Sequence, residues 1–326
     1  MKVFKYIILT WGLFICSLGI AQQEMLYTQY FFSQLVINPA YAGNDDGLSL
    51  TGLSKKQWFG IDGAPTILSF VAHASVLDHN SACRVFEGES GKSSLKPVRN
   101  KQVGIGLVVF NDRVGVTNTL ISSLSYSYKI KFKPGTKLSF GLQGTVLNFN
   151  QSLNKLDNPN VSDPNFQDNV TALRFNAGAG IFFETDRFYI GGSIPEIYEN
   201  SLDPVNSSNE KQLRQYFFTG GYVFYLNRIF KFKPTFLVRY TEGLPLQVDF
   251  NANFLYKDKL WMGASYRYNH SMNFTTELLI SGNLRMGLAY DYAIGDIKQA
   301  TIGSAEIMIN YVFRKQDKKI INPRYF

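Results

Sequence analysis

Apolar and polar side chains alternate along most of this chain, from about Leu48 to the C-terminus. Between residues 246 and 256, every second side chain is apolar or aromatic, and the side chains between them are mostly polar. Residues 138–146 and 284–292 show the same pattern. A period of two residues predicts β-strands with one apolar face and one polar face. A soluble β-sandwich would also alternate, so the period alone does not decide the fold.

The lengths of the alternating runs separate these two possibilities. Strands in soluble sheets average about five or six residues, whereas a tilted strand needs about nine to eleven to cross a membrane. Most of the runs reach the longer length, and they number fourteen, an even number as bacterial single-chain barrels require. We therefore predict an all-β fold, a transmembrane antiparallel β-barrel of about 14 strands within residues 48–314. The predicted strands are residues 48–59, 65–77, 102–112, 118–131, 136–149, 172–184, 187–195, 214–226, 229–241, 245–257, 259–269, 272–281, 284–294 and 302–314.

The composition fits such a barrel. Aromatic residues make up 15% of the chain, with 19 Tyr and 27 Phe, while the mean hydropathy is only −0.09. Beyond the N-terminal region, no segment has about 18 consecutive apolar residues, the length that a membrane helix requires. Barrel strands expose only every second residue to lipid, so an aromatic-rich but moderately hydrophilic chain is expected.

The first residues predict export. Lys2 and Lys5 precede an apolar stretch that ends with Gly19 and Ala21, the pattern of a signal peptide cleaved after Ala21. A lipoprotein signal acylated at Cys16 is disfavoured, because large apolar residues precede that cysteine. Removal of residues 1–21 takes away two lysines and lowers the formal charge from +8 to +6.

The lengths of the connections predict the orientation. Tight connections occur at Lys133-Pro134-Gly135, Thr185-Asp186, Asn227-Arg228, Asp258 and Gly282-Asn283. The intervening connections are longer on average, notably Asn150–Thr171 and Glu196–Leu213. Because short turns of such barrels are periplasmic, we expect both termini there, as a segment at residues 22–47 and a tail at residues 315–326. The insertion between Asp78 and Lys101 would be an unusually long periplasmic connection.

Aromatic residues near strand ends predict interfacial girdles, in which rings lie at the height of the lipid head groups. Candidates are Tyr126 and Tyr128, Phe182 and Phe183, Phe230 and Phe232, and Tyr266 and Tyr268. The last strand, Glu306–Phe313, also ends in an aromatic residue, which resembles the signal read by barrel-assembly machinery.

The residues that carry most enzyme chemistry are sparse. Cys83 is the only cysteine of the mature chain, and three histidines form no HExxH pattern, so we expect no metal site and no cofactor. The pairs Gly104 and Gly106, and Gly178 and Gly180, are interpreted as small residues on a crowded barrel wall instead of a nucleotide-binding loop. Basic residues form no long block, which argues against a nucleic-acid partner and leaves lipid head groups or an acidic partner. We predict that the chain is not an enzyme.

Four charged residues fall on the inward phase of successive predicted strands: Arg239, Asp249, Arg267 and Glu277. Counting from the turns places each near the height of the next, so we predict a ladder of opposite charges across the lumen. A wet pore with scattered charges is the open alternative.

The segment Tyr27–Gly43 is too polar for a lipid-facing strand and too aromatic for a free linker, so it should dock on something. The residues expected to bind a partner are Tyr27, Tyr30, Phe31, Asn38, Pro39, Tyr41 and Gly43. A segment that packs on the barrel's own base is an equally open interpretation.

The motifs Tyr27-Thr-Gln-Tyr30 and Ile37-Asn-Pro-Ala-Tyr-Ala-Gly43 resemble the opening of the PorP/SprF family, outer-membrane proteins tied to type IX secretion and gliding motility in Bacteroidetes. The resemblance continues through Lys56-Gln-Trp58, Gly60-Ile-Asp-Gly-Ala-Pro65, Asn111-Asp112, Asp186-Arg-Phe-Tyr189, Asp258-Lys-Leu-Trp261 and Pro323-Arg-Tyr-Phe326. It implies partners among the secretion machinery and a secreted adhesin whose C-terminal domain the barrel helps to export or hold at the surface. The insertion between Asp78 and Lys101 departs from the family pattern.

These observations predict an outer-membrane barrel that assists export or surface anchoring of a partner adhesin through protein–protein binding. A porin-like or small-molecule transporter is the main alternative and would need a continuous polar lumen. An outer-membrane hydrolase is a third interpretation, which would need a Ser/His or acidic dyad.

Overall fold

The computed structural model describes residues 27–30, 33–45, 47–78, 101–133, 135–153, 169–199, 213–268, 270–294 and 296–313. The predicted signal peptide, the insertion within residues 79–100, Phe31 and the tail at residues 315–326 lie outside these ranges. Within them, no helix is long and apolar enough to cross a membrane.

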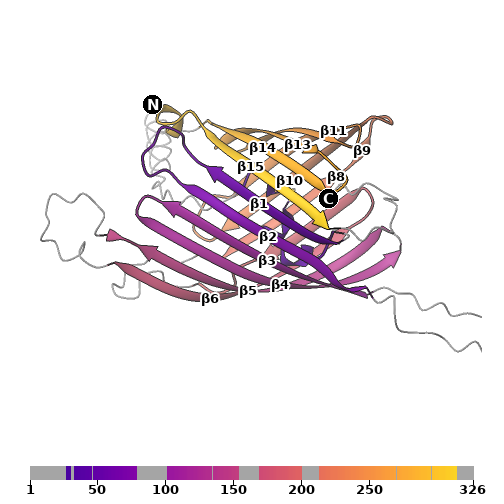
Figure 1. The fold of residues 1–326 in the computed structure, drawn as a ribbon, viewed down its shortest axis with the longest axis horizontal. Coiled ribbons are helices and arrows are strands. Elements are labelled where there is room, and N and C mark those ends of the chain that lie inside the picture. Colours follow the sequence, from indigo (N-terminus) through magenta and orange to yellow (C-terminus); the bar gives the residue numbers. More distant parts are fainter. Residues whose placement is uncertain are drawn as a thin grey trace, which may run out of the picture.

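The strands form a single antiparallel sheet that closes on itself, as Figure 1 shows with its strands running obliquely around the wall. They are β1 (Leu48–Lys56), β2 (Thr66–Asp78), β3 (Lys101–Val114), β4 (Thr117–Lys133), β5 (Thr136–Gln151), β6 (Val170–Glu184), β7 (Phe188–Ile194), β8 (Gln215–Tyr222), β9 (Phe224–Tyr225), β10 (Phe230–Thr241), β11 (Gln247–Tyr256), β12 (Leu260–Arg267), β13 (Ser271–Leu279), β14 (Leu284–Ala293) and β15 (Ser304–Phe313). β8 and β9 are two parts of one strand interrupted at Val223, so the predicted barrel of 14 strands is confirmed.

Closure is made by the first and last strands. β15 pairs with β1 in register from Leu48 opposite Phe313 to Lys56 opposite Ala305, and every other strand pairs with its neighbour in sequence. A closed barrel satisfies all backbone hydrogen bonds between strands and leaves no free edge, the requirement for a sheet surrounded by lipid.

Apolar side chains cover the outer face of the sheet and polar side chains its inner face, the reverse of a soluble protein. On β11, Phe250 and Phe254 point outward and are 59% and 43% exposed, whereas Asp249 and Asn251 point inward and are buried. The same alternation recurs on β13, β14 and β15, where exposed apolar residues alternate with buried ones. An apolar outer surface around a polar interior is the arrangement that suits a lipid surrounding.

The two ends of the barrel differ in their connections. At one end, which we call the short-turn end, compact turns follow β4, β6, β9, β11 and β13, and β15 finishes there. At the other end, which we call the long-loop end, the chain takes Gln57–Pro65 between β1 and β2 and residues 294–303 between β14 and β15, the latter including the 3-10 helix η6 (Asp296–Gln299).

Strand length also varies around the barrel. β3 to β6 have 14 to 17 residues, whereas β11 to β15 have 8 to 10. At about 3.3 Å per residue, the longer strands exceed the span of a membrane. The extra length lies at the long-loop end, where polar residues such as Asn111, Asn148 and Asn150 occupy the outward phase. This side of the barrel therefore rises beyond the apolar band.

The predicted girdle positions mostly point outward. Tyr126, Tyr266 and Phe230 are exposed on the outer face. Phe182 contradicts its prediction, because it is completely buried and points into the lumen. Adjacent residues of a strand face opposite sides, so Phe182 and Phe183 could not both have belonged to a girdle.

The described part of the segment predicted to be periplasmic, residues 22–47, instead lies largely inside the barrel. Two short 3-10 helices, η2 (Gln34–Val36) and η3 (Pro39–Tyr41), form its centre, and nearly all of its described residues are buried. We call the described residues between Tyr27 and Asp45 the plug segment. The physical reason for this location lies in its contacts with the wall.

Candidate functional site: a lumen filled by the N-terminal segment

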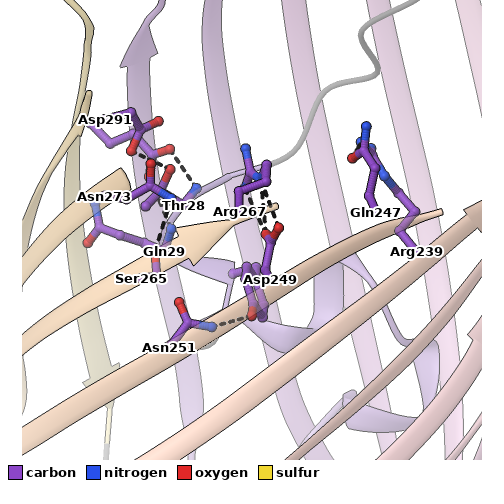
Figure 2. Close-up of polar contacts among 12 residues, drawn as sticks. Thr28, Gln29, Arg239, Gln247, Asp249, Asn251, Ser265, Arg267, Asn273 and Asp291 are labelled. Carbon is purple, nitrogen blue, oxygen red and sulfur yellow. Dashed lines mark hydrogen bonds and ion pairs between the residues drawn. The ribbon is translucent and has the colours of Figure 1, made fainter. Parts of the chain in front are cut away.

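The first residues of the plug segment contact a cluster of three buried charged side chains near the long-loop end. Lys55 Nζ lies 2.8 Å from Asp291 Oδ2 and 2.8 Å from Glu306 Oε1, and β1, β14 and β15 supply these three residues. Thr28 donates from its backbone N to Glu306 at 2.6 Å and from its hydroxyl to Asp291 at 2.6 Å. The backbone N of Gln29 donates to the second Glu306 oxygen at 3.2 Å. Each carboxylate is thus held by both the wall and the plug segment, and Figure 2 shows the Thr28 side of this arrangement at Asp291.

A second ion pair flanks the next residues of the segment. Arg267 on β12 donates two bonds of 2.9 Å and one of 3.0 Å to the carboxylate of Asp249 on β11. Beside this pair, the side-chain amide of Asn251 donates to the hydroxyl of Tyr30 at 2.6 Å. The Tyr30 ring packs with Phe217 and Leu237 of the wall and with Ile37 of the plug segment. A buried Arg–carboxylate fork has the geometry that offsets the cost of removing both charges from water.

The structure brings together only the central pair of the predicted charge ladder. All four residues point inward and are buried, but Arg239 donates to Gln247 and not to Asp249, as Figure 2 shows. Glu277 is not a neighbour of Arg267, whose partner across the tight turn is Ser271. Glu277 lies further along β13, toward the short-turn end, with Arg285 Nη1 at 3.8 Å. The predicted height of Glu277 in the barrel was wrong, because Arg267 is the last residue of β12 and pairs with Ser271 directly across the turn.

The middle of the plug segment is fixed by one asparagine side chain. The Asn38 amide nitrogen donates to the carbonyl oxygens of Ile181 at 3.0 Å and Gly192 at 3.4 Å, on β6 and β7. Its amide oxygen accepts from the backbone N of Ala40 at 3.0 Å, which caps η3. The Ser193 hydroxyl donates to the carbonyl of Ile37 at 2.5 Å. An Asn-Pro pair thus both starts the turn and attaches it to the wall.

Glycines on the inner wall make room for this close approach. A Cβ atom on Gly141 would lie 2.1 Å from the Ala40 nitrogen, and one on Gly104 would lie 2.1 Å from the Ala42 oxygen. A Cβ on Gly180 would lie 2.2 Å from the Asn38 side chain. Such distances are impossible for a real Cβ, so glycine is required at these three points of contact between the plug segment and the sheet. The prediction of small residues on a crowded wall therefore has a specific cause.

Aromatic side chains pack together inside the lumen toward the short-turn end. Tyr41 meets Phe182 edge-on with ring centroids 5.6 Å apart, and Phe182 stacks on Tyr189 at 5.5 Å. Val71 and Val108 belong to the same buried cluster. Aromatic pairs of this kind add about 0.5–1.5 kcal/mol beyond the area they bury.

The segment leaves the lumen near the short-turn end. The Asn44 amide donates to Glu184 at 2.8 Å, and Lys137 lies 2.7 Å from the other oxygen of the same carboxylate. Gly43 has φ +64°, and a Cβ there would lie 2.6 Å from the Ala74 oxygen, so glycine is required on both grounds. The chain therefore runs through the lumen from the long-loop end to the short-turn end before β1 begins.

The residues expected to bind a partner thus contact this chain's own wall. Tyr27, Tyr30, Asn38, Pro39, Tyr41 and Gly43 are all buried, and Phe31 lies outside the described residues. The interpretation that the segment packs on its own barrel, left open by the sequence, matches this geometry. Sequence reasoning missed Lys55, Asp291 and Glu306, although each is a charged residue on the inward phase of a predicted strand.

A small charged pocket remains at the long-loop end, above the start of the plug segment. Its lining includes Lys55, Arg239, Arg267, His270 and Asp291. Burial, reinforced by the nearby Arg267 charge, lowers the pKa of His270 to about 4, so the imidazole in this turn is neutral at physiological pH. Among the described residues, no group of three or more His, Cys, Asp or Glu is arranged to hold a metal ion.

Solved structures with a similar fold are membrane barrels. The CymD monoaromatic hydrocarbon channel aligns with a TM-score of 0.48 and 10% identity over 91% of this chain and 96% of that chain. The Pseudomonas putida toluene transporter TodX gives 0.44 and 11% identity over 86% and 92%, and the Acinetobacter baumannii outer membrane protein Omp33 gives 0.43 and 9% over 83% and 100%. The comparison with curated proteins found no match.

A family model settles the relationship that these distant structures leave open. The model of the type IX secretion system membrane protein PorP/SprF matches residues 19–311, which include nearly all of the plug segment and the barrel. The match agrees with the motifs found from Tyr27 to Trp261. The chain therefore belongs to the PorP/SprF family of type IX secretion system membrane proteins.

Proposed function

We propose that this barrel assists the export or surface anchoring of a partner adhesin in type IX secretion and gliding motility, by protein–protein binding and without catalysis. Its partners would be that adhesin, or the C-terminal domain of the adhesin, and components of the secretion machinery. Outer-membrane lipid surrounds it in this proposal.

The observation that carries the proposal is the filled lumen. Hydrogen bonds join the plug segment to β4, β6, β7, β11, β14 and β15, its backbone touches wall glycines on β3 and β5, and its Asn38 side chain touches a glycine on β6. A porin-like transporter needs a continuous polar passage, and this segment occupies the space where such a passage would run. A barrel whose interior is filled by its own chain is better suited to bind another protein through its rims and loops than to conduct a solute.

In this proposal the long-loop end faces outside and the short-turn end faces the periplasm, following the asymmetry of such barrels. The working surface is then the long-loop end, including the connections within residues 150–171 and 196–213, and not the buried residues Tyr27 to Gly43. Loops held on a rigid barrel are where binding usually resides.

The base of one of these loops is held firmly. The Asn176 side chain on β6 donates to the carbonyl of Tyr198 at 2.8 Å and accepts from the backbone N of Ile197 and of Tyr198, both at 3.0 Å. Arg214, where the chain returns to β8, donates to the carbonyl of Ile197 at 2.8 Å. Tyr198 is nevertheless 60% exposed, which is the combination of rigidity and accessibility that protein interfaces favour.

The test is deletion of the gene and complementation with variants. Deletion should abolish surface display of one adhesin and leave outer-membrane permeability unchanged, and a crosslinked pull-down from intact outer membranes should recover that adhesin. Complementation with Tyr198→Ala should restore display poorly, whereas Tyr268→Ala should restore it fully. Tyr268 is a matched control because it is 67% exposed at the same end of the barrel.

The orientation is tested in the same strain with a membrane-impermeant thiol reagent. A cysteine replacing Glu242, in the turn after β10, should be labelled in intact cells, and one replacing Gly282, in the turn after β13, only after lysis. If all secreted proteins reach the surface without the barrel while uptake of a small solute falls, the transporter interpretation replaces the proposal.

A further inference from the structure

The strand formed by β8 and β9 is broken where it faces a proline. The pairing with β10 keeps one register on both sides of the break, from Thr235 opposite Gly221 to Phe232 opposite Phe224, so Pro234 faces Tyr222. Proline has no N–H to donate to the ladder. Val223 is completely buried and donates its N–H at 2.7 Å to the carbonyl of Arg187, in the turn before β7.

The break gathers aromatic rings on the outer face near the short-turn end. Beyond Val223, Phe224, Tyr225 and Leu226 are all exposed, in place of the usual alternation. Ring centroids lie 4.6 Å apart for Tyr222 and Phe224, 6.2 Å for Phe224 and Phe232, 4.8 Å for Phe232 and Phe254, and 5.0 Å for Phe230 and Tyr256. These rings lie in contact with one another, whereas a girdle needs only separate rings at the same height.

Cations lie beside rings on both faces of the wall at this end, because Tyr225 shares the inward phase of its pairing partner Lys231, which is buried and forms an ion pair with Asp258. The Arg187 guanidinium lies 4.9 Å from the centre of the Tyr225 ring, with Lys231 Nζ at 5.4 Å from the same ring. Lys257 Nζ lies 5.1 Å from the Tyr256 ring. Arg228 is exposed in the turn between β9 and β10. Cations that lie over ring faces are attracted by the ring quadrupole, so this arrangement is itself favourable.

The turns of this surface carry more exposed cations than exposed acids. The three turns after β6, β9 and β11 carry the exposed cations Arg187, Arg228, Lys257 and Lys259 against the two exposed acids Asp186 and Asp258. The neighbouring turn after β13, residues 280–283, contains Ile, Ser, Gly and Asn and carries no charge.

We propose that this surface, which we call the break patch, binds the phosphate head group of an anionic glycerophospholipid. It consists of Arg187, Arg228 and Lys257 with the rings from Tyr222 to Tyr256 described above. The rings would lie along the acyl chains and glycerol backbone, and the cations would contact the phosphate. Under the proposed orientation, this lipid belongs to the periplasmic leaflet.

The position of the cations favours lipid over an acidic protein. Arg228 and Lys257 lie in the turns directly after β9 and β11, whose Phe224 and Phe254 are exposed on the outer face, and Lys257 Nζ lies over the Tyr256 ring. Basic residues beside a membrane surface attract anionic head groups, and Tyr and Trp rings belong at the same height. The proposal does not depend on the adhesin function.

The experiment is native mass spectrometry of the purified full-length chain in detergent, with phosphatidylglycerol, phosphatidylcholine or lipid A added in turn. The test variant is Arg187→Gln with Arg228→Gln and Lys257→Gln. The matched control is Lys56→Gln with Arg113→Gln and Lys298→Gln, which removes the same charge at the opposite end. Lys56 and Lys298 are also cations over rings, 5.9 Å from Phe59 and 5.4 Å from Tyr292. Altered migration of unheated samples on gels checks that all variants fold.

We expect phosphatidylglycerol adducts on the parent chain, few phosphatidylcholine adducts, and at least a tenfold loss of the phosphatidylglycerol adducts in the test variant alone. Equal binding of both phospholipids, or equal loss in both variants, would overturn the proposal. So would lipid A adducts that depend on the control residues. Unchanged phosphatidylglycerol adducts, together with loss of binding to a poly-glutamate peptide, would assign the patch to an acidic protein instead.

Discussion

Lys55 is the cation on which the start of the plug segment depends. It lies between Asp291 and Glu306, and both carboxylates also accept hydrogen bonds from Thr28. All of these groups are buried, so the electrostatic balance of the cluster rests on contacts within the protein and not on water.

Replacing Lys55 with Met would leave two buried carboxylates without their cation. We expect the free energy of unfolding to fall by about 3–5 kcal/mol, the range for removing one partner of a buried ion pair. Guanidinium unfolding in detergent micelles measures the loss. Lys56→Met is the control, because Lys56 is the next residue on β1 and is exposed on the outer face. An equal loss in both variants would contradict the role given to the buried cluster.

Single residues also mark where sequence reasoning succeeded and failed. The inward phase of Arg239, Asp249, Arg267 and Glu277 was predicted correctly, since alternation fixes which face a side chain takes. The interaction partners of these four residues were not predicted correctly, because they depend on the strand register and on where each turn begins. Asp249 and Arg267 are directly opposite each other, whereas Glu277 lies opposite Trp261.

At the scale of elements, the plug segment and the glycine-lined wall form one unit. Gly104, Gly141 and Gly180 lie on three different strands, yet each leaves space for the same short stretch of chain, Asn38–Ala42. The fit requires small residues at those places and tolerates larger ones where the strand faces lipid.

A pair of glycines on β5 tests this fit. A Cβ at Gly141 would collide with Ala40, whereas a Cβ at Gly144 would meet nothing within 4 Å. We expect Gly141→Val to displace the plug segment and Gly144→Val to leave it in place. The reporter is Ser33→Cys in a Cys83→Ser background, since Ser33 is buried and Cys is close to it in size.

In this assay, maleimide should label the cysteine at least tenfold faster in Gly141→Val than in the parent or in Gly144→Val. Equal labelling rates in the two glycine variants would show that the wall glycines do not hold the segment. A cysteine that is labelled rapidly in the parent chain would contradict its burial.

The strands were predictable because their signal is local. Each predicted run corresponds to an observed strand, and the main departure is the break at Val223. That break lies beside the position that faces Pro234 of the following strand, which residues 214–226 do not include. The plug segment was harder still, because the contacts that locate it join Thr28 to Glu306, 278 residues away.

The whole molecule is a barrel with two different ends and an interior occupied by the plug segment. The break patch borders the short-turn end, the long strands β3 to β6 rise at the long-loop end, and the plug segment separates the two mouths. Under the proposed function, such a molecule makes its contacts at its surfaces, and we expect conduction through it to require removal of the plug segment.

The most direct test of this central claim is single-channel conductance in a planar bilayer. The purified parent chain should give no sustained conductance, and a variant lacking residues 27–44, confirmed as folded by its migration on gels, should open steady channels. Gly141→Val should give transient channel openings, because the plug segment should leave its position against the wall from time to time. A parent chain that conducts continuously at the level of the deletion variant would contradict the account.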